Sequence, residues 1–393
     1  MDILIVTNFC SDFSATDNDR FLYLARMLSK EHNVEIVTSD FCHEKKSHRN
    51  TAAADWSPIK ITFLSEPGYK KNICLKRFYS HIKWGKSLKK YLAKREKPDV
   101  IYCAVPSLSG PSVAAKYCEK NGVKFVIDVQ DLWPEAFKMV FNVPVLSKLI
   151  FLPFEALANG IYKRADSVCA VSDTYVERAL RSNKKCNSGH SVFLGTDLSN
   201  FDRNIEKTVE LEKNDDEIWL AYCGTLGSSY DLTTAFDALA KLKNDKIKFI
   251  VMGDGPKMQE FKDYSESLGL NVHFTGRIPY DQMCATLAKC DININPISHG
   301  AAQSIINKHA DYAASGNPVI STQENREYRE LVESFNMGYN CSNGDSDGMA
   351  KRIAELAKNR ELREEMGKNA RKCAEQRFDR RNSYGELVSA VLE

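Results

Sequence analysis

The chain has 393 residues, of which 43% are hydrophobic and 27% are charged, and its formal net charge is +2. This composition is typical of a globular protein and excludes an intrinsically disordered chain. Because the net charge is close to zero and no nucleic-acid-binding motif is present, we expect no nucleic acid among the partners. The length predicts about two to three domains.

Cysteine usage and apolar segments bear on where the protein works. Twelve cysteines are scattered through the sequence with no C-x-x-C pair, so we expect reduced core cysteines of a cytosolic protein. No segment reaches the ~18 apolar residues of a membrane-spanning helix. The opening MDILIVTNF has no positively charged region, which favours a first strand over a signal peptide. We expect a cytoplasmic protein, free or bound peripherally to the inner face of the plasma membrane.

Short aliphatic segments alternate with amphipathic helical patterns through the first half. We expect strands at 3–7, 34–39, 60–65, 99–105, 124–129 and 167–172. The intervening segments 19–31 and 110–122 have the periodicity of helices. Continuous apolar strands separated by helices indicate a parallel sheet that is covered on both faces.

The alternation resumes after a polar interruption at 198–217, which is the best linker candidate. The second series of expected strands comprises 218–224, 247–253, 272–276, 291–296 and 318–322. These patterns predict an α/β protein with two doubly wound, Rossmann-like domains, at 1–197 and 198–375, and a C-terminal helix at 376–393 that returns to the first domain. Ligands of such sheets bind at the carboxyl ends of the strands.

Glycine-containing turns follow three strands of the second domain. The turn CGTLGSS contains Gly227 and Ser228, where the backbone can approach a phosphate and a hydroxyl can donate a hydrogen bond. Gly253 follows the next strand, and Arg277 and Ile278 follow the one after it. Each turn also has a plain interpretation, as a tight connection or, for Arg277, as a surface cation.

The stretch SIINKHADYAASGNPVIST predicts a helix that begins at Asn307 and ends before Gly316. Lys308 and Asp311 lie three residues apart and share one helix face. A cation beside the positive N-terminal end of a helix is unfavourable unless an anion lies between them. The alternative is a surface ion pair worth about 0.5 kcal/mol, but the apolar context favours a packed helix. We therefore expect a nucleotide, with its diphosphate at Lys308 and its ribose at a carboxylate.

Together these motifs resemble the nucleotide-sugar domain of family 4 glycosyltransferases, the retaining enzymes of the GT-B fold. The resemblance runs through AYCGTLG, FIVMGDGP, VHFTGRIP, KCDININP and INKHADYAASGNPVIST, and it reaches the first half in VIDVQDLWPEAF and YKRADSVCAVSDTYVE. QDLWPE is similar to bacterial members that build O-antigen, capsule or exopolysaccharide chains. The implied fold is GT-B, with two Rossmann-like domains facing a central cleft.

The resemblance assigns donor-binding roles by position. Asp311 matches the second acid of the family's E-x7-E motif, which binds the ribose, whereas Gln303 replaces the first acid. Gly227 matches the glycine whose backbone meets the diphosphate, but the basic residues common after it are missing, which leaves Lys308 more of the phosphate neutralisation. The loop GRIP matches the one that reads the base. The expected donor-binding residues are Gly227, Ser228, Gly253, Arg277, Ile278, Gln303, Ile306, Asn307, Lys308 and Asp311.

The first half is expected to hold the acceptor. The turn after the first strand carries Asp12 and Asp17, which suit sugar hydroxyls better than phosphate. In QDLWPE, Asp131 is the best polar candidate, and Trp133 is either a platform for a sugar or a core residue. The basic, aromatic-bearing segment 69–97 suits an anionic membrane surface or a polyprenyl-diphosphate-linked acceptor, with a solvated helix as the alternative. The expected catalytic residues are Lys308, Asp311 and Asp131.

The family implies a retaining, metal-independent glycosyltransferase with a nucleotide-sugar donor, a UDP-sugar above others, and no cofactor. The acceptor would be a glycan or a polyprenyl-diphosphate-linked sugar in the synthesis of bacterial surface polysaccharide. Two alternatives stay open. One is a nucleotide-sugar 2-epimerase of the same fold, and the other is a catalytically silent module that binds glycans or partners.

Overall fold

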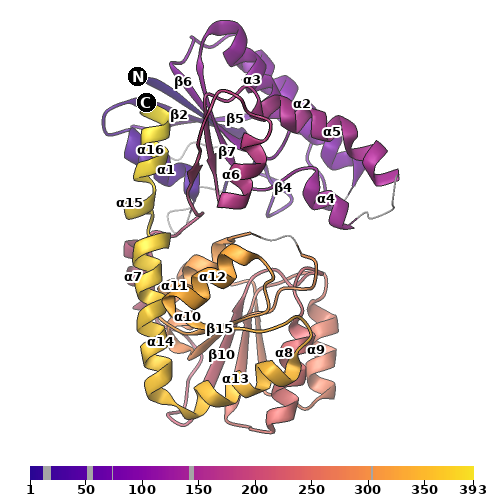
Figure 1. Cartoon of the computed structure of the whole chain (residues 1–393), viewed down its shortest axis with the longest axis vertical. Coiled ribbons are helices and arrows are strands. Elements are labelled where there is room, and N and C mark those ends of the chain that lie inside the picture. The colour runs from indigo at the N-terminus through magenta and orange to yellow at the C-terminus, as the bar shows by residue number, and fades with distance from the viewer. Residues whose placement is uncertain (12–18, 51–55, 73, 141–145, 302–303) are drawn as a thin grey trace. The chain divides into compact units, whose positions relative to one another are not determined.

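A computed structural model describes residues 1–11, 19–50, 56–72, 74–140, 146–301 and 304–393. The chain divides into two compact units, of which unit 1 comprises Met1–Phe193 with Ser383–Glu393 and unit 2 comprises Leu194–Asn382. In each unit helices cover a twisted parallel sheet (Figure 1). The α/β, doubly wound architecture expected from the sequence is therefore confirmed.

The segment 198–217 is not simply a linker. Its first part forms α7 (Leu198–Ile205), and Phe201 on that helix is buried. α7 packs against α10 (Tyr280–Lys289) and belongs to unit 2. The prediction was wrong because two apolar side chains, Leu198 and Phe201, suffice to anchor a two-turn helix, and the many polar neighbours obscured them.

The sheet of unit 1 has seven strands in the order β5-β2-β1-β6-β7-β8-β9, all parallel. Strand order reverses between β1 and β6, which marks the edge where ligands of such sheets bind. β9 and the hairpin of β3 and β4 were not expected, because two-residue strands show no periodicity. The strands are β1 (Asp2–Val6), β2 (Asn33–Ser39), β3 (Phe41–Cys42), β4 (Ser47–His48), β5 (Lys60–Leu64), β6 (Val100–Val105), β7 (Lys124–Val129), β8 (Ser167–Ala170) and β9 (His190–Ser191).

The helices of unit 1 present one apolar face to the sheet. α2 buries Ser80, Trp84 and Leu88 at a spacing of four residues and leaves its lysines exposed. The helices are α1 (Arg20–Leu28), α2 (Leu75–Leu92), α3 (Ser109–Asn121), α4 (Glu135–Val140), α5 (Leu146–Tyr162), α6 (Asp173–Leu180) and α16 (Gly385–Leu392). None of the helices in the described part of the chain is both long enough and apolar enough to cross a membrane.

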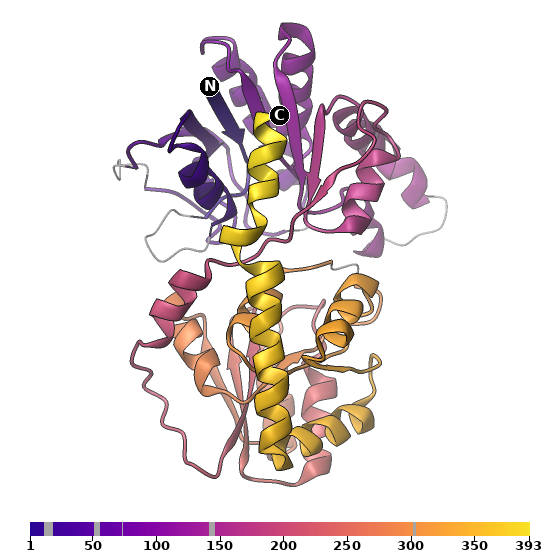
Figure 2. The same ribbon diagram turned by 60° about the vertical axis from the view of Figure 1, so that its left-hand side comes forward.

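α16 completes the core of unit 1 although it follows unit 2 in the chain. It packs on α1 and on β8 (Figure 2), and Tyr384, Leu387 and Val391 are fully buried there. Arg20 links this helix to the sheet, since its guanidinium pairs with Asp128 at 2.9 Å and donates to the Tyr384 hydroxyl at 3.1 Å.

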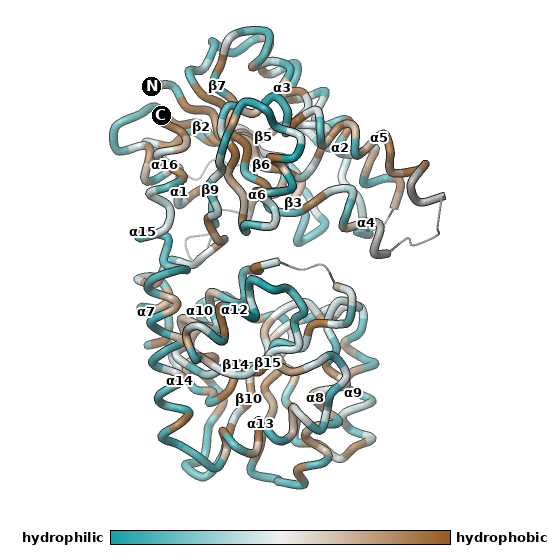
Figure 3. The backbone as a smooth tube through the Cα atoms, in the orientation of Figure 1, coloured by the Kyte–Doolittle hydropathy of each residue, from teal (hydrophilic) through white to brown (hydrophobic). Residues whose placement is uncertain are grey.

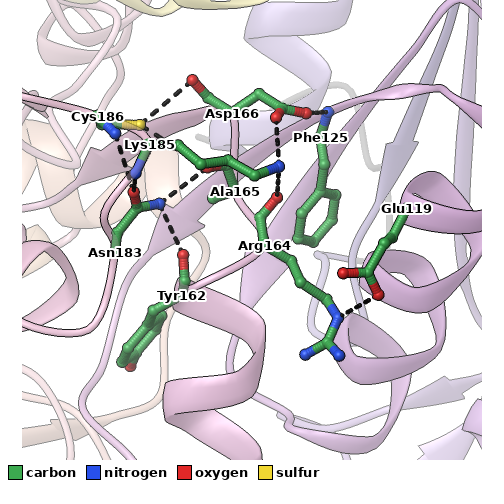
Figure 4. Close-up of polar contacts among 9 residues, drawn as sticks. All are labelled: Glu119, Phe125, Tyr162, Arg164, Ala165, Asp166, Asn183, Lys185 and Cys186. Carbon is green, nitrogen blue, oxygen red and sulfur yellow. Dashed lines mark hydrogen bonds and ion pairs between the residues drawn. The ribbon is translucent and has the colours of Figure 1, made fainter.

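At the amino-terminal ends of β7 and β8, a polar network holds the segment that leads into β8 (Figure 4). Asn183 donates to the carbonyls of Tyr162 and Ala165 and accepts from the backbone N–H groups of Lys185 and Cys186. Asp166 accepts the Phe125 N–H at 2.9 Å. Every polar group of the Asn183 side chain is thus satisfied within the fold, which indicates a structural role.

The sheet of unit 2 has six parallel strands in the order β12-β11-β10-β13-β14-β15. The strands are β10 (Ile218–Cys223), β11 (Ile247–Met252), β12 (Val272–Gly276), β13 (Ile292–Asn295), β14 (Val319–Ser321) and β15 (Gly338–Asn340). The other helices of the unit are α8 (Leu232–Leu242), α9 (Met258–Ser267), α11 (Asn307–Ala314), α12 (Arg326–Phe335), α13 (Ser346–Lys358), α14 (Arg360–Cys373) and a π-helical turn (Ala374–Phe378) that leads into α15 (Arg380–Ser383).

Candidate functional site

The strand order of unit 2 places its ligand-binding edge between β10 and β13, where the direction of winding reverses. The loops that leave these strands lie together. The Ser298 N–H, after β13, donates to the carbonyl oxygen of Ser229, after β10, at 3.0 Å. The Ser298 hydroxyl donates to the carbonyl oxygen of Ser228 at the same distance. The expected donor-binding residues Gly227 and Ser228 therefore lie at this edge.

The turns after β10, β11 and β12 form one interlocked surface. The Gly224 N–H donates to Met252 O at 2.9 Å, and the Gly253 N–H donates to Gly276 O at 2.9 Å. Gly224 and Gly253 have φ values of 139° and 153°, and a Cβ added at Gly253 would lie 1.8 Å from the Gly224 carbonyl oxygen. Glycine is needed here because one turn packs directly on the backbone of the next. By contrast, a Cβ on Gly227 would meet only the Thr225 side chain, at 3.8 Å.

Lys308 lies beside these turns on the first turn of α11. Its ammonium nitrogen is 4.1 Å from the centre of the Tyr222 ring and 4.0 Å from that of Tyr230. It is buried and has no hydrogen-bond partner among the residues that the structure describes. Burial lowers the pKa of this amine to about 7. The alternative of a surface ion pair with Asp311 is excluded, since both side chains are buried.

Asp311 is one turn further along α11 and points to different partners. The Tyr280 hydroxyl donates to its Oδ1 at 2.8 Å and lies 3.0 Å from the Thr196 hydroxyl, and Thr196 also hydrogen-bonds to the carboxylate. Burial raises the pKa of Asp311 to about 6 against these hydrogen bonds. Its role toward a ribose stays a prediction.

The remaining expected donor residues are distributed around this edge. Arg277 is exposed and Ile278 is half-buried after β12, while Ile306 and Asn307 form the start of α11. Gln303 lies outside the described residues. His299, after β13, contacts Glu324 through Nδ1 and Oε1 at 2.7 Å.

Sequence reasoning missed the partners that hold the two charged groups. Tyr222 and Tyr230 enclose Lys308, and Tyr280 and Thr196 hold Asp311. A tyrosine at the end of a strand and another in the following turn, YCGTLGSSY, were the available signal. It was not used because aromatic residues at such places usually pack in a core.

In unit 1, QDLWPE follows β7 but presents no open platform. Trp133 is only 4% exposed, and its indole N–H donates to Asp131 Oδ2 at 3.1 Å. The other oxygen of Asp131 accepts the Leu132 N–H at 2.9 Å, and burial raises the pKa of this carboxyl. Trp133 is a packed residue, as the alternative interpretation had it. The two expected acceptor-binding residues of the first turn, Asp12 and Asp17, lie outside the described residues.

The basic segment 69–97 is divided by the helix that it forms. Most of its lysines are exposed, but Arg77 points inward and is 9% exposed. A hollow of about 310 Å³ lies between α3 and α5. No group of three or more potential metal ligands occurs among the described His, Cys, Asp and Glu residues.

Comparison with known proteins places this geometry in context. Residues 204–373 match the family model of glycosyl transferases group 1. EpsD of Bacillus subtilis (strain 168), named as a glycosyltransferase, is 22% identical over 305 residues, which cover 74% of this chain and 75% of EpsD. WcaI of Escherichia coli (strain K12), named as a glycosyl transferase of colanic acid biosynthesis, is 21% identical over 252 residues, and the match spans 62% of each protein.

Solved structures extend the comparison to the whole chain. HepE of Anabaena, crystallised with UDP, superposes with a TM-score of 0.69 at 16% identity over 99% of both chains. Its complex with UDP-glucose gives a TM-score of 0.68 at 16% identity over 98% of both chains. The chain therefore has the GT-B fold, and its residues 204–373 match the family model of glycosyl transferases group 1.

Proposed function

We propose that the protein is a retaining, metal-independent glycosyltransferase in the synthesis of bacterial surface polysaccharide. It transfers a sugar from a UDP-sugar to a glycan or to a polyprenyl-diphosphate-linked acceptor. The family match supports the reaction type, HepE supports the donor, and WcaI supports the pathway. The observation that carries the proposal is the buried ammonium group of Lys308, which has no described counter-anion and lies beside the glycine turns at the strand ends.

A diphosphate accounts for these features together. It would supply the negative charge that Lys308 lacks, and it favours the N-terminus of α11, where backbone N–H groups point outward. Glycine turns let its oxygens approach the backbone closely. A neutral ligand would leave the buried cation uncompensated, which is costly in a low-dielectric site.

In the reaction, the bond between the anomeric carbon and the diphosphate oxygen breaks. The acceptor hydroxyl oxygen bonds to the same face of that carbon, and its proton goes to the departing diphosphate oxygen. The protein contributes position and stabilisation of the charge that develops on the leaving group. We assign that stabilisation to Lys308, and no carboxylate of the protein acts as a nucleophile.

A peripheral membrane attachment fits unit 1. α2 exposes Leu75, Tyr79 and Ile82 among its lysines. It contacts α5 through Phe78 and Phe154, whose ring centres are 5.3 Å apart, and α5 exposes further apolar side chains. The hydrophobic colour along α5 is visible in Figure 3. Apolar side chains flanked by lysines suit an interface with anionic lipid. The exposed apolar residues of α5 are Leu149, Ile150, Leu152 and Leu157.

The donor site is tested by thermal unfolding with UDP, GDP, ADP, CMP and TDP, each with and without magnesium. A nucleotide at 100 times its dissociation constant adds about 2.7 kcal/mol of stability. We expect UDP to raise the melting temperature equally with magnesium and with EDTA. Absence of a shift with every nucleotide would contradict the proposal.

The reaction itself is tested by following UDP-sugars by NMR with and without a lipid-linked or glycan acceptor. We expect UDP release to depend on acceptor and the product to keep the anomeric configuration of the donor. An epimerised nucleotide sugar that forms without acceptor would replace the proposal by the 2-epimerase alternative.

A further inference from the structure

Arg77 is enclosed by aromatic rings inside unit 1. Its guanidinium carbon lies 4.7 Å from the centre of the Trp133 ring and 5.6 Å from the centres of the Phe9 and Tyr69 rings. We call these four residues the Arg77 cage. The rings come from segments that follow β1, β5 and β7, so the cage lies at the carboxyl ends of the strands.

The hydrogen bonds of Arg77 leave part of its guanidinium unused. Nη1 donates to the Asn72 carbonyl oxygen at 2.9 Å, and Tyr69 is a second partner. Nε is buried and lacks a partner within the described part of the chain. An arginine fork usually meets a planar or tetrahedral oxyanion with two donors at once.

The charge of Arg77 also lacks a close counter-ion. The other buried arginine of this unit, Arg20, shows the usual solution, since two of its nitrogens bond to the two oxygens of Asp128 at 2.9 and 3.0 Å. Arg77 has no carboxylate within 4 Å among the described residues. The carboxylate of Asp131 acts on the charge of Arg77 from a distance. Its two oxygens accept hydrogen bonds from the Leu132 N–H and the Trp133 indole N–H, not from Arg77.

A second acid near the cage, Glu66, is buried and accepts hydrogen bonds from Asn8 and Ser80 at 2.9 and 2.8 Å rather than from Arg77. His81 stacks on Trp133 with ring centres 5.7 Å apart, and His43 contacts the Tyr69 hydroxyl at 2.5 Å. Burial lowers the pKa of both histidines to about 3, so both are neutral near pH 7. The ammonium nitrogen of Lys46 lies 3.2 Å from the same Nδ1 atom of His43 and brings a further cation. Arg77 is therefore enclosed without an ion pair to either nearby acid among the described residues, which favours an anion.

We propose that Arg77 binds an acidic group of the acceptor, a phosphate or a carboxylate. The inference rests on the proposed function, because it assumes that unit 1 holds the acceptor. It narrows the acceptor class, since a neutral glycan would leave the caged cation unpaired. The two sources of the anion are a lipid diphosphate and an acidic sugar.

The test uses the full chain saturated with UDP, so that the donor site is filled, and titrates farnesyl diphosphate, inorganic pyrophosphate or glucuronate by calorimetry. We expect at least one anion to bind, and Arg77→Gln to weaken that binding at least tenfold while UDP binding stays unchanged. Lys120→Gln, at an exposed lysine of α3 outside the segment 69–97, is the control and should bind as the wild type does.

The outcomes separate the two proposals. Failure of the wild type to bind UDP would count against the donor site and not against Arg77. Normal UDP binding with no anion bound, or with equal binding by Arg77→Gln, would overturn the Arg77 assignment. Should Arg77→Gln fail to fold, Arg77→Lys keeps the charge but loses the fork and should still weaken binding, and unchanged affinity in that variant overturns the assignment. Preference for farnesyl diphosphate or for glucuronate identifies the source of the anion.

Discussion

The ammonium nitrogen of Lys308 lies over the ring of Tyr230, 4.0 Å from its centre. The centre of the Tyr222 ring is 4.1 Å from the same nitrogen, and the two rings together stabilise a cation in a place where burial disfavours it. The pKa of about 7 means that the charge is present in only part of the ligand-free molecules at neutral pH. The ligand-free protein therefore tolerates a group whose charge is useful only when an anion arrives.

Lys308→Met should abolish stabilisation by UDP and yet make the ligand-free protein more stable. Because the folded-state pKa is depressed, the burial penalty is fully present below pH 7 and disappears as the pH rises toward the unfolded value near 10.5. Each pKa unit by which burial lowers the pKa corresponds to about 1.4 kcal/mol. Of the two pH values measured, the variant should therefore gain more free energy of unfolding at pH 6.5 than at pH 10. Melting curves at pH 6.5 and pH 10 measure it, and a loss of stability at pH 6.5 would show that Lys308 supports the fold.

UDP affinity should fall as the pH rises above about 7, by up to tenfold per unit, because the diphosphate needs the protonated amine. Calorimetry in buffers with different ionisation enthalpies should show proton uptake on binding near pH 8. The two tyrosines offer a control, since Tyr230→Phe keeps the ring and should leave this profile in place. Binding without proton uptake would place the diphosphate elsewhere.

Asp311→Asn should weaken UDP binding at least tenfold with little loss of ligand-free stability at pH 7.5. The pKa of Asp311 is raised to about 6, so the burial penalty on its charged form is absent at low pH and present above pH 6. Asparagine removes that penalty and still accepts the Tyr280 hydroxyl. Asp263→Asn, on the exposed face of α9, is the control, and binding equal to that control would remove Asp311 from the donor site.

Gly253→Ala should destabilise unit 2 by about 3 kcal/mol, because the new methyl group would meet the Gly224 carbonyl and the backbone has a positive φ. Gly269→Ala is a matched control, since Gly269 also has a positive φ but has nothing within 4 Å of the added Cβ. It should cost about 1 kcal/mol. Urea unfolding of both variants measures the difference in the free energy of unfolding. Equal losses would mean that the turn of Gly253 can move away from the turn of Gly224 at no cost.

Leu387→Ala should cost about 2–5 kcal/mol, as expected for a large side chain removed from a core. Leu392, on the same helix, is 38% exposed, and its substitution by alanine should cost well under 1 kcal/mol. Urea unfolding followed by the fluorescence of the unit 1 tryptophans reports the effect. Equal effects of both variants would mean that α16 does not belong to the core of unit 1.

The long apolar strands and the start of α11 were predictable from sequence, because each carries its own periodicity or capping signal over consecutive residues. Lys308 and Asp311 could be singled out for the same reason. Their partners could not, since Tyr280 and Thr196 are far from Asp311 in the chain and meet it only through the sheet order. The burial of Arg77 could not be predicted either, because the rings that cover it follow three different strands and two of them are far from it in the chain.

The position of α16 sets an order of events during synthesis. Unit 2 is translated between the two pieces of unit 1. At ordinary ribosome speeds, α1 and β8 are therefore made on the order of tens of seconds before α16, the helix that packs on them. During that interval the nascent unit 1 exposes the surface that later receives Leu387 and Val391. The half of the protein that is made first is thus completed last, and it is the half that we expect chaperones to protect.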